Sequence, residues 1–164
     1  MSRFTLTCAV ALCTFATSSF SEGHMSDERR TVINCLEAVG VSDDITWNQC
    51  VGLMFAPCLD DTPGSDDHAT CLSREHDAWT VIFQKEQTDV KAMLSPEGET
   101  ELSKILESWG SYVKLQCNAA SLERGGSESA RLGCEIAETV SVTMELVACR
   151  EGRSTAPFCK PKDG

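Results

Sequence analysis

The sequence predicts an all-α protein, a small antiparallel bundle of three long and two short helices that is stapled by disulfides. Apolar residues recur every three or four positions through most of the chain, as they do on one face of a helix. No segment alternates apolar and polar residues in the manner of a half-buried strand. Eight cysteines follow residue 21, and an even number in an exported chain is typical of a disulfide framework.

Residues 1–21 are expected to be a cleavable signal peptide. Arg3 precedes an apolar run over residues 4–20, and Ser19 and Ser21 give the small-x-small pattern of a cleavage site. A lipid anchor is the alternative, but Cys13 follows a leucine where lipidation needs a small residue. We therefore expect a periplasmic or secreted protein with one helical domain over residues 22–149 and an irregular tail over residues 150–164.

The first two elements are predicted to be short helices. Residues 27–39 carry apolar side chains at helical spacing, and Gly40 is placed to end the helix. A second helix is expected after residues 42–44, continuing through Val51 and Met54 towards Pro57. The acidic segment 60–67 then reads as a loop, because its Pro-Gly pair favours a turn.

Three long helices are predicted from residue 66 onwards. The first covers residues 66–94, the second begins at Pro96 behind the cap residue Ser95 and runs to about residue 122, and the third follows the break at 125–126 with Ser127 as its cap. Each has one apolar stripe, expected to face the others. These largely apolar stripes contain Cys71, Leu72, Glu75, Ala78, Trp79, Ile82 and Phe83, then Leu102, Ile105, Leu106, Trp109, Val113 and Cys117, then Leu132, Ile136, Val140, Met144 and Val147.

Charge narrows the classes of partner. Lys and Arg total 14 and Asp and Glu total 25, a net charge of −11 that becomes −12 when Arg3 leaves with the signal peptide. Such a field repels nucleic acid and anionic lipid, and it steers basic proteins towards the chain. An acidic surface is also an ordinary way for an exported protein to stay soluble. We expect no nucleic-acid partner and no membrane insertion after signal cleavage.

No motif indicates catalysis, and we expect a protein that is not an enzyme and needs no cofactor. The chain has no Gly-x-Ser-x-Gly elbow, no phosphate-binding Gly loop and no His-Glu-x-x-His motif. His68, Cys71, Glu75 and His76 are the one set that suggests a metal, but structural zinc usually takes cysteines two to four residues apart. The aromatic residues Trp47, Trp79, Trp109 and Tyr112 are expected to be core residues rather than a binding platform.

The cysteine framework resembles a known family. The stretches CLSREHDAW and SWGSYVKLQC, the Gly-Gly-Ser turn and the stretch LGCEIAETVSVTMEL are similar to the LprI-type lysozyme-inhibitor domain family over about residues 35–146. The resemblance implies a small helical envelope protein, with Cys117 bridged to Cys134 across the glycine turn and, as in some members, lysozyme inhibition. The chain departs from the family at polar positions, with Val113 and Val142 in place of arginines.

The disulfide pairing stays open on the sequence alone, because eight cysteines allow on the order of a hundred connectivities. The family pattern offers no partner for Cys149 and Cys159, so we expect these two to join each other. The remaining four then pair among themselves, and the favoured pairs are Cys35–Cys50 and Cys58–Cys71.

The implied inhibitor role has a physical basis. Lysozymes cleave with two carboxylates in a cleft, and many are basic, so a rigid acidic protein would be steered to the cleft and block it. The candidate partner-binding residues lie in the acidic loop or the glycine turn, and they are Asp60, Asp61, Asp66, Asp67 and Glu128. The expected partner is lysozyme or another basic envelope protein. The alternative is a helical envelope protein that binds another partner without inhibiting lysozyme.

Overall fold

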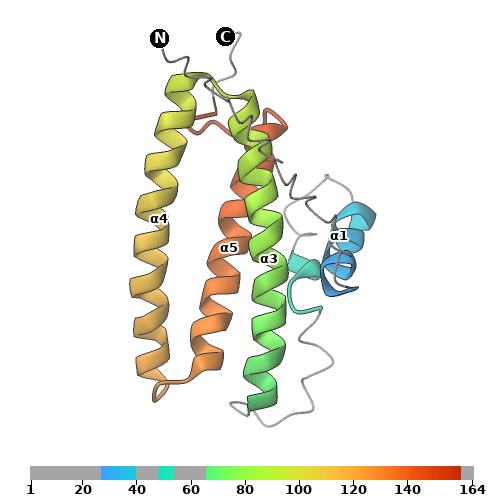
Figure 1. Ribbon diagram of the computed structural model, residues 1–164, viewed down its shortest axis with the longest axis vertical. Coiled ribbons are helices and arrows are strands. Elements are labelled where there is room, and N and C mark those ends of the chain that lie inside the picture. Colours follow the sequence, from blue (N-terminus) through green and yellow to red (C-terminus); the bar gives the residue numbers. More distant parts are fainter. Residues whose placement is uncertain (1–26, 40–47, 54–65, 160–164) are drawn as a thin grey trace, which may run out of the picture.

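The computed structural model describes residues 27–39, 48–53 and 66–159 (Figure 1). It confirms the all-α class, since these residues contain helices and no β-strand. The elements are α1 (Asp27–Val39), the 3-10 helix η1 (Asn48–Cys50), α3 (Asp66–Met93), α4 (Pro96–Glu123) and α5 (Glu128–Arg150). The predicted signal peptide lies outside the described residues.

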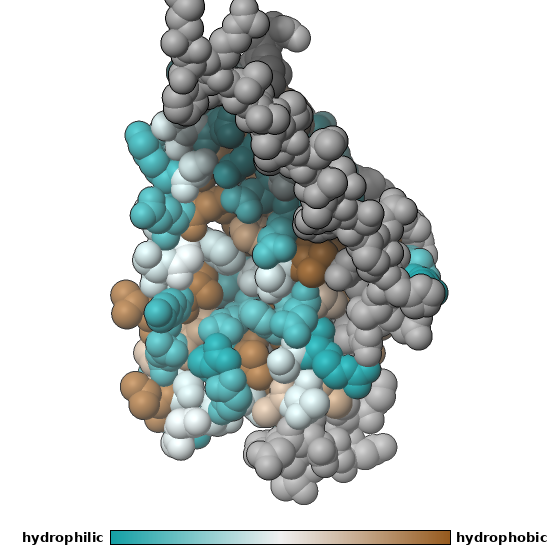
Figure 2. Space-filling model, viewed as in Figure 1, coloured by the Kyte–Doolittle hydropathy of each residue, from teal (hydrophilic) through white to brown (hydrophobic). Residues whose placement is uncertain are grey.

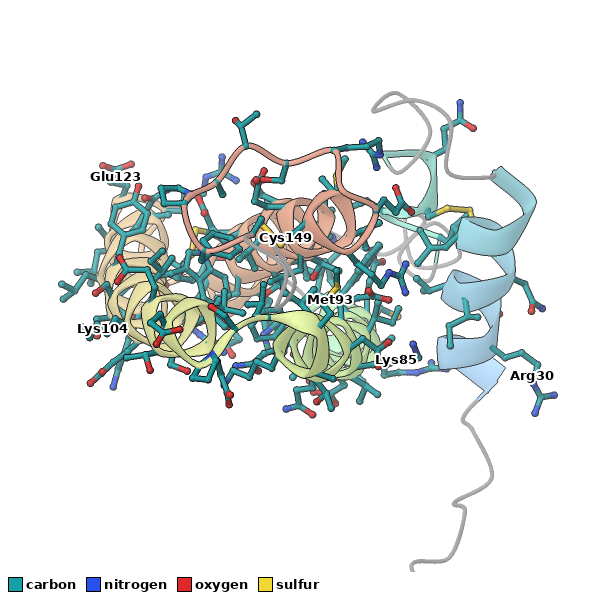
Figure 3. The ribbon with its side chains drawn as sticks, turned by 90° about the horizontal axis from the view of Figure 1, so that it is seen from above. Arg30, Lys85, Met93, Lys104, Glu123 and Cys149 are labelled. Carbon is teal, nitrogen blue, oxygen red and sulfur yellow. A yellow bond between two sulfur atoms is a disulfide. The ribbon has the colours of Figure 1, made fainter. Side chains whose placement is uncertain are left out.

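The central helix of the bundle is α5, which packs along both α3 and α4, whereas α3 and α4 contact each other little. Viewed down the helices, α4 forms one outer edge and α1 lies at the other, beyond α3 (Figure 3). Consecutive long helices are antiparallel, as expected from short connections. The most extensive contact, between α3 and α5, is parallel because α4 returns the chain to the end where α3 began (Figure 1).

Both predicted caps of the long helices are confirmed. The hydroxyl of Ser95 accepts a hydrogen bond from the backbone N–H of Gly98 at 3.2 Å, and that of Ser127 accepts one from Ala130 at 3.3 Å. Gly125 and Gly126 adopt φ values of 70° and 83°, a conformation that glycine reaches without steric cost. The glycine pair therefore lets the chain reverse between α4 and α5.

Two hydrophobic clusters form the core. The first joins α1, η1, α3 and α5 around Trp79, which is fully buried. The second joins the last turns of α3, the first half of α4, the end of α5 and the tail, and it contains Val90, Leu94, Leu102, Leu106, Leu146, Cys149 and Phe158. Residues 151–159, which follow α5, contain turns and no helix, and Phe158 makes this segment part of the core.

Two details differ from the sequence prediction. The second short helix is only η1 in the described residues and does not continue through Val51, because Gly52 takes a left-handed φ of 85° that an α-helix excludes. Ile105 and Tyr112 are 37% and 56% exposed, so neither belongs to the core. They lie on a second apolar stripe of α4 that faces away from α5.

Three disulfides join described cysteines, and all three pairings agree with those expected: Cys35–Cys50, Cys117–Cys134 and Cys149–Cys159. They fasten α1 to η1, α4 to α5, and α5 to the tail. Cys71 is disulfide-bonded as well, and Cys58, its favoured partner, lies outside the described residues.

Glu86 is a buried carboxylate near the end of α3 and is only 7% exposed. Its Oε2 lies 3.2 Å from Nη1 of Arg150 on α5, and Lys85 is 4.0 Å from its Oε1. Burial raises the pKa of Glu86 because the carboxylate loses water, and the nearby charges of Arg150 and Lys85 offset this only in part. Ionised Glu86 therefore costs stability relative to its protonated form.

We expect Glu86→Gln to raise the thermal midpoint at pH 7 and to change it little at pH 4. A carboxyl whose pKa is higher in the folded than in the unfolded state stabilises the fold at low pH, and this contribution is lost as pH rises through the raised pKa. Thermal unfolding of both proteins across this range measures the difference. Glu107→Gln removes an exposed glutamate from α4 and is the control, and a pH-independent difference for Glu86→Gln would contradict the assignment.

Candidate functional site

Three of the five residues predicted to bind a partner lie at the starts of two helices, at the same end of the bundle (Figure 1). Asp66 and Asp67 are the first two residues of α3, and Glu128 is the first of α5. Nδ1 of His68 and the hydroxyl of Ser129 are hydrogen-bonded at 3.0 Å, which joins the two helix starts. We call Asp66, Asp67 and Glu128 the acidic end. Asp60 and Asp61, the other two candidates, lie outside the described residues.

The turn beside the acidic end is held from two directions. The disulfide Cys117–Cys134 connects the last turns of α4 to the start of α5, with 5.4 Å between the Cα atoms. The hydroxyl of Ser121 donates to the carbonyl oxygen of Ser127 at 2.9 Å across the turn. The position of Glu128 is thus fixed relative to α4 as well as α3.

Glu128 also begins a row of ion pairs along α5. Nε of Arg131 donates to Oε2 of Glu128 at 2.9 Å, and Nη1 of Arg131 lies 2.6 Å from Oε1 of Glu135. The hydrogen bond from Arg131 lowers the pKa of Glu128, and the bond to Glu128 is the main cause that raises the pKa of Arg131. Glu128 is therefore ionised at neutral pH while part of its charge is compensated.

A groove of about 530 Å³ lies between α3 and α4, and sequence reasoning did not predict it. Helix α5 supplies one side of it. We call it the α3–α4 groove, and among the residues lining it are His76, Thr80 and Phe83 of α3, Trp109, Lys114 and Asn118 of α4, and Arg131, Glu135 and Thr139 of α5.

The chemistry of the groove is mixed. The rings of Phe83 and Trp109 contact each other, with centroids 5.3 Å apart at a 45° angle, and provide an apolar wall. Nε2 of His76 lies 3.5 Å from Oε2 of Glu135, and Arg131 pairs with the same carboxylate. Polar hydrogen-bonding groups thus lie beside an aromatic surface, an arrangement suited to a small polar ligand or to a side chain of a partner protein. Trp109 is accordingly a groove residue rather than a core residue.

The four residues considered for a metal do not form a site in the structure. Cys71 is disulfide-bonded, Glu75 is buried and accepts a hydrogen bond from the backbone N–H of Gly52, and His68 and His76 contact Ser129 and Glu135 respectively. Within residues 27–39, 48–53 and 66–159 there is no group of three or more His, Cys, Asp or Glu side chains arranged to hold a metal ion.

Comparison of the chain with family models, with curated proteins and with solved structures finds no match. The resemblance to LprI-type domains therefore rests on the sequence motifs, and membership of that family stays a prediction. In the part of the chain that the structure describes, no helix has an apolar stretch long enough to cross a membrane.

Proposed function

We propose that the protein is an exported, LprI-like helical protein that binds a basic lysozyme through its acidic end and blocks the substrate cleft. The observation that carries the proposal is the hydrogen bond between His68 and Ser129. It joins the starts of α3 and α5, so that Asp66 and Asp67 of one candidate surface lie at the same end of the bundle as Glu128 of the other. The proposed role is binding and involves no catalysis.

Charge and rigidity support this choice. The net charge, −11 for the full chain and −12 once Arg3 leaves with the signal peptide, attracts a basic protein over a long range, and such steering raises association rates. The Cys117–Cys134 disulfide fixes the turn, so little conformational entropy is lost on binding. Disulfides persist in oxidising compartments, which supports a periplasmic or secreted location for the encounter.

A lysis assay tests the proposal. Purified protein is mixed with a basic lysozyme, and the clearing of a cell-wall suspension is followed over a range of protein and salt concentrations. We expect slower lysis at low salt and a weaker effect at high salt, because salt screens surface charges. Lysis that stays unchanged at every concentration and salt level would refute lysozyme inhibition.

Matched variants locate the surface. Neutralising the acidic end with Asp66→Asn, Asp67→Asn and Glu128→Gln should raise the dissociation constant about tenfold. The control removes the same charge at the start of α4, which lies at the opposite end of the bundle (Figure 1). It carries Glu97→Gln, Glu99→Gln and Glu101→Gln. A 28-residue helix is about 42 Å long, far beyond the Debye length of about 10 Å. Equal weakening by both variants would show that net charge alone matters.

The second candidate is a helical envelope protein that binds another partner without inhibiting lysozyme. The α3–α4 groove favours it, because the groove places Trp109 beside the paired His76, Arg131 and Glu135. Retention of a partner by the wild type, but not by Trp109→Ala, in a pull-down that leaves lysis unaffected would support this role over inhibition.

A further inference from the structure

The outer side of α4 carries an apolar stripe that no described element covers. Ile105, Tyr112, Leu115 and Leu122 are 37%, 56%, 73% and 75% exposed. In Figure 2 hydrophobic side chains project from the left edge of the molecule, which is formed by α4. Single exposed apolar residues are ordinary on a protein surface, but a row of them on one helix indicates an interface.

The stripe has the same order of apolar and small residues when it is followed from either end of α4. Ile105 and Leu122 are equally far from a point between Val113 and Lys114, and so are Tyr112 and Leu115. Ser108 and Ala119, the two small exposed residues in the stripe, are centred on the same point. A second copy of α4, packed antiparallel about a twofold axis through this point, would place apolar residues on apolar ones and small on small.

Charge along α4 favours the antiparallel arrangement. Up to Glu107 the helix carries four glutamates and one lysine, whereas from Lys114 to the cap residue Arg124 it carries two basic residues and one glutamate. A parallel pair would align the two acidic halves. An antiparallel pair sets each acidic half against the half with more positive charge, and it also opposes the two helix dipoles.

The position of α4 leaves room for such a partner. It is an outer helix of the bundle, and Figure 3 shows Lys104 and Glu123 projecting on its side away from α5. The stripe spans 18 residues, from Ile105 to Leu122, and the rise between these two is about 26 Å of helix. Contact over this length resembles a two-stranded coiled coil, in which apolar layers alternate along the seam.

We propose that the protein forms a twofold homodimer in which α4 of one copy packs antiparallel against α4 of the other through Ile105, Tyr112, Leu115 and Leu122. An isologous contact of this kind closes on itself and leaves no free surface for further growth. The dimer forms whether or not the acidic end binds lysozyme.

Sedimentation of the purified, disulfide-bonded protein over a concentration series measures the dimer. We expect wild type to approach twice the chain mass, and Leu115→Glu with Leu122→Glu to weaken the dimer at least about a hundredfold, since charges at the centre of an interface remove its main apolar anchors. Gln84→Glu with Thr88→Glu adds two equal charges at exposed positions of α3 and should leave the dimer intact. A monomeric wild type, or equal weakening by both variants, would overturn the proposal.

A charge-restoration experiment tests the orientation. Ile105→Lys and Leu122→Glu should each dissociate the dimer, whereas the chain that carries both should regain it, because Lys at 105 then faces Glu at 122 of the other copy. In a parallel dimer each new charge meets its own like charge, and the double variant would stay monomeric. Helical circular dichroism of each variant confirms that the fold is retained, so failure of restoration in folded protein would exclude the antiparallel contact.

Discussion

Replacing Trp79 by alanine is expected to lower the free energy of unfolding by about 3–5 kcal/mol, the range for truncating a large buried aromatic side chain. Trp79 is fully buried in the first hydrophobic cluster, where α3 meets α1 and α5. Its cluster includes Val32 of α1 and Ile136 and Val140 of α5. The lost side chain would leave a cavity shared by three helices that disulfides and turns prevent from closing fully.

Urea unfolding with the disulfides intact measures this loss. The matched control is Trp109→Ala, because Trp109 is only partly buried and borders the α3–α4 groove. We expect that variant to lose less than about 2 kcal/mol. Equal losses for the two tryptophans would mean that the first cluster is not the main source of stability.

The long helices could be predicted because their caps and breaks are local signals. Ser95 with Pro96, and the glycines before Ser127, fix where α4 begins and where α5 follows, and a hydroxyl finds its N–H partner three residues away whatever the rest of the chain does. The parallel contact of α3 with α5 is different. It depends on which helices pack their apolar faces together, and the order of the helices along the chain does not determine this.

Burial on α4 was predicted only in part. The helix has two apolar stripes at similar spacing, one through Leu102, Leu106 and Val113, and another through Ile105 and Tyr112. Periodicity places residues on a face but does not say which face meets the bundle. The structure buries the first stripe and exposes the second, so the assignment of Ile105 and Tyr112 to the core was wrong.

The parts of the candidate site differ in how far the sequence could predict them. Glu128, Arg131 and Glu135 stand three and four residues apart, the spacing of ion pairs on a helix, and this signal could have identified their network. The α3–α4 groove had no such signal. His76, Trp109 and Glu135 come from three helices, and only the packing of those helices brings them together.

Replacing both Cys117 and Cys134 by serine is expected to lower the free energy of unfolding by about 3 kcal/mol. This is the chain-entropy value for a loop of this size, since the two cysteines are 17 positions apart. The structure also indicates which half of α4 should lose more stability. The second hydrophobic cluster contains Leu102 and Leu106 of α4, whereas the later half of the helix contributes to neither cluster. The later half is tied to α5 by the disulfide and by a hydrogen bond from Gln116 to Glu138 at 3.1 Å.

Hydrogen exchange of the backbone amides therefore gives the sharper measurement. In the variant, amides from Val113 to Glu123 should exchange faster than those from Leu102 to Leu106, because the later half opens locally while the second cluster holds the earlier half. Replacing Cys149 and Cys159 by serine is the control. That pair closes a shorter loop, with a separation of 10 positions, and its loss should speed exchange in the tail around Phe158 without exposing the later half of α4. Uniform acceleration along α4 in the Cys117 and Cys134 variant would mean that the helix opens as one unit and that the disulfide does not act locally.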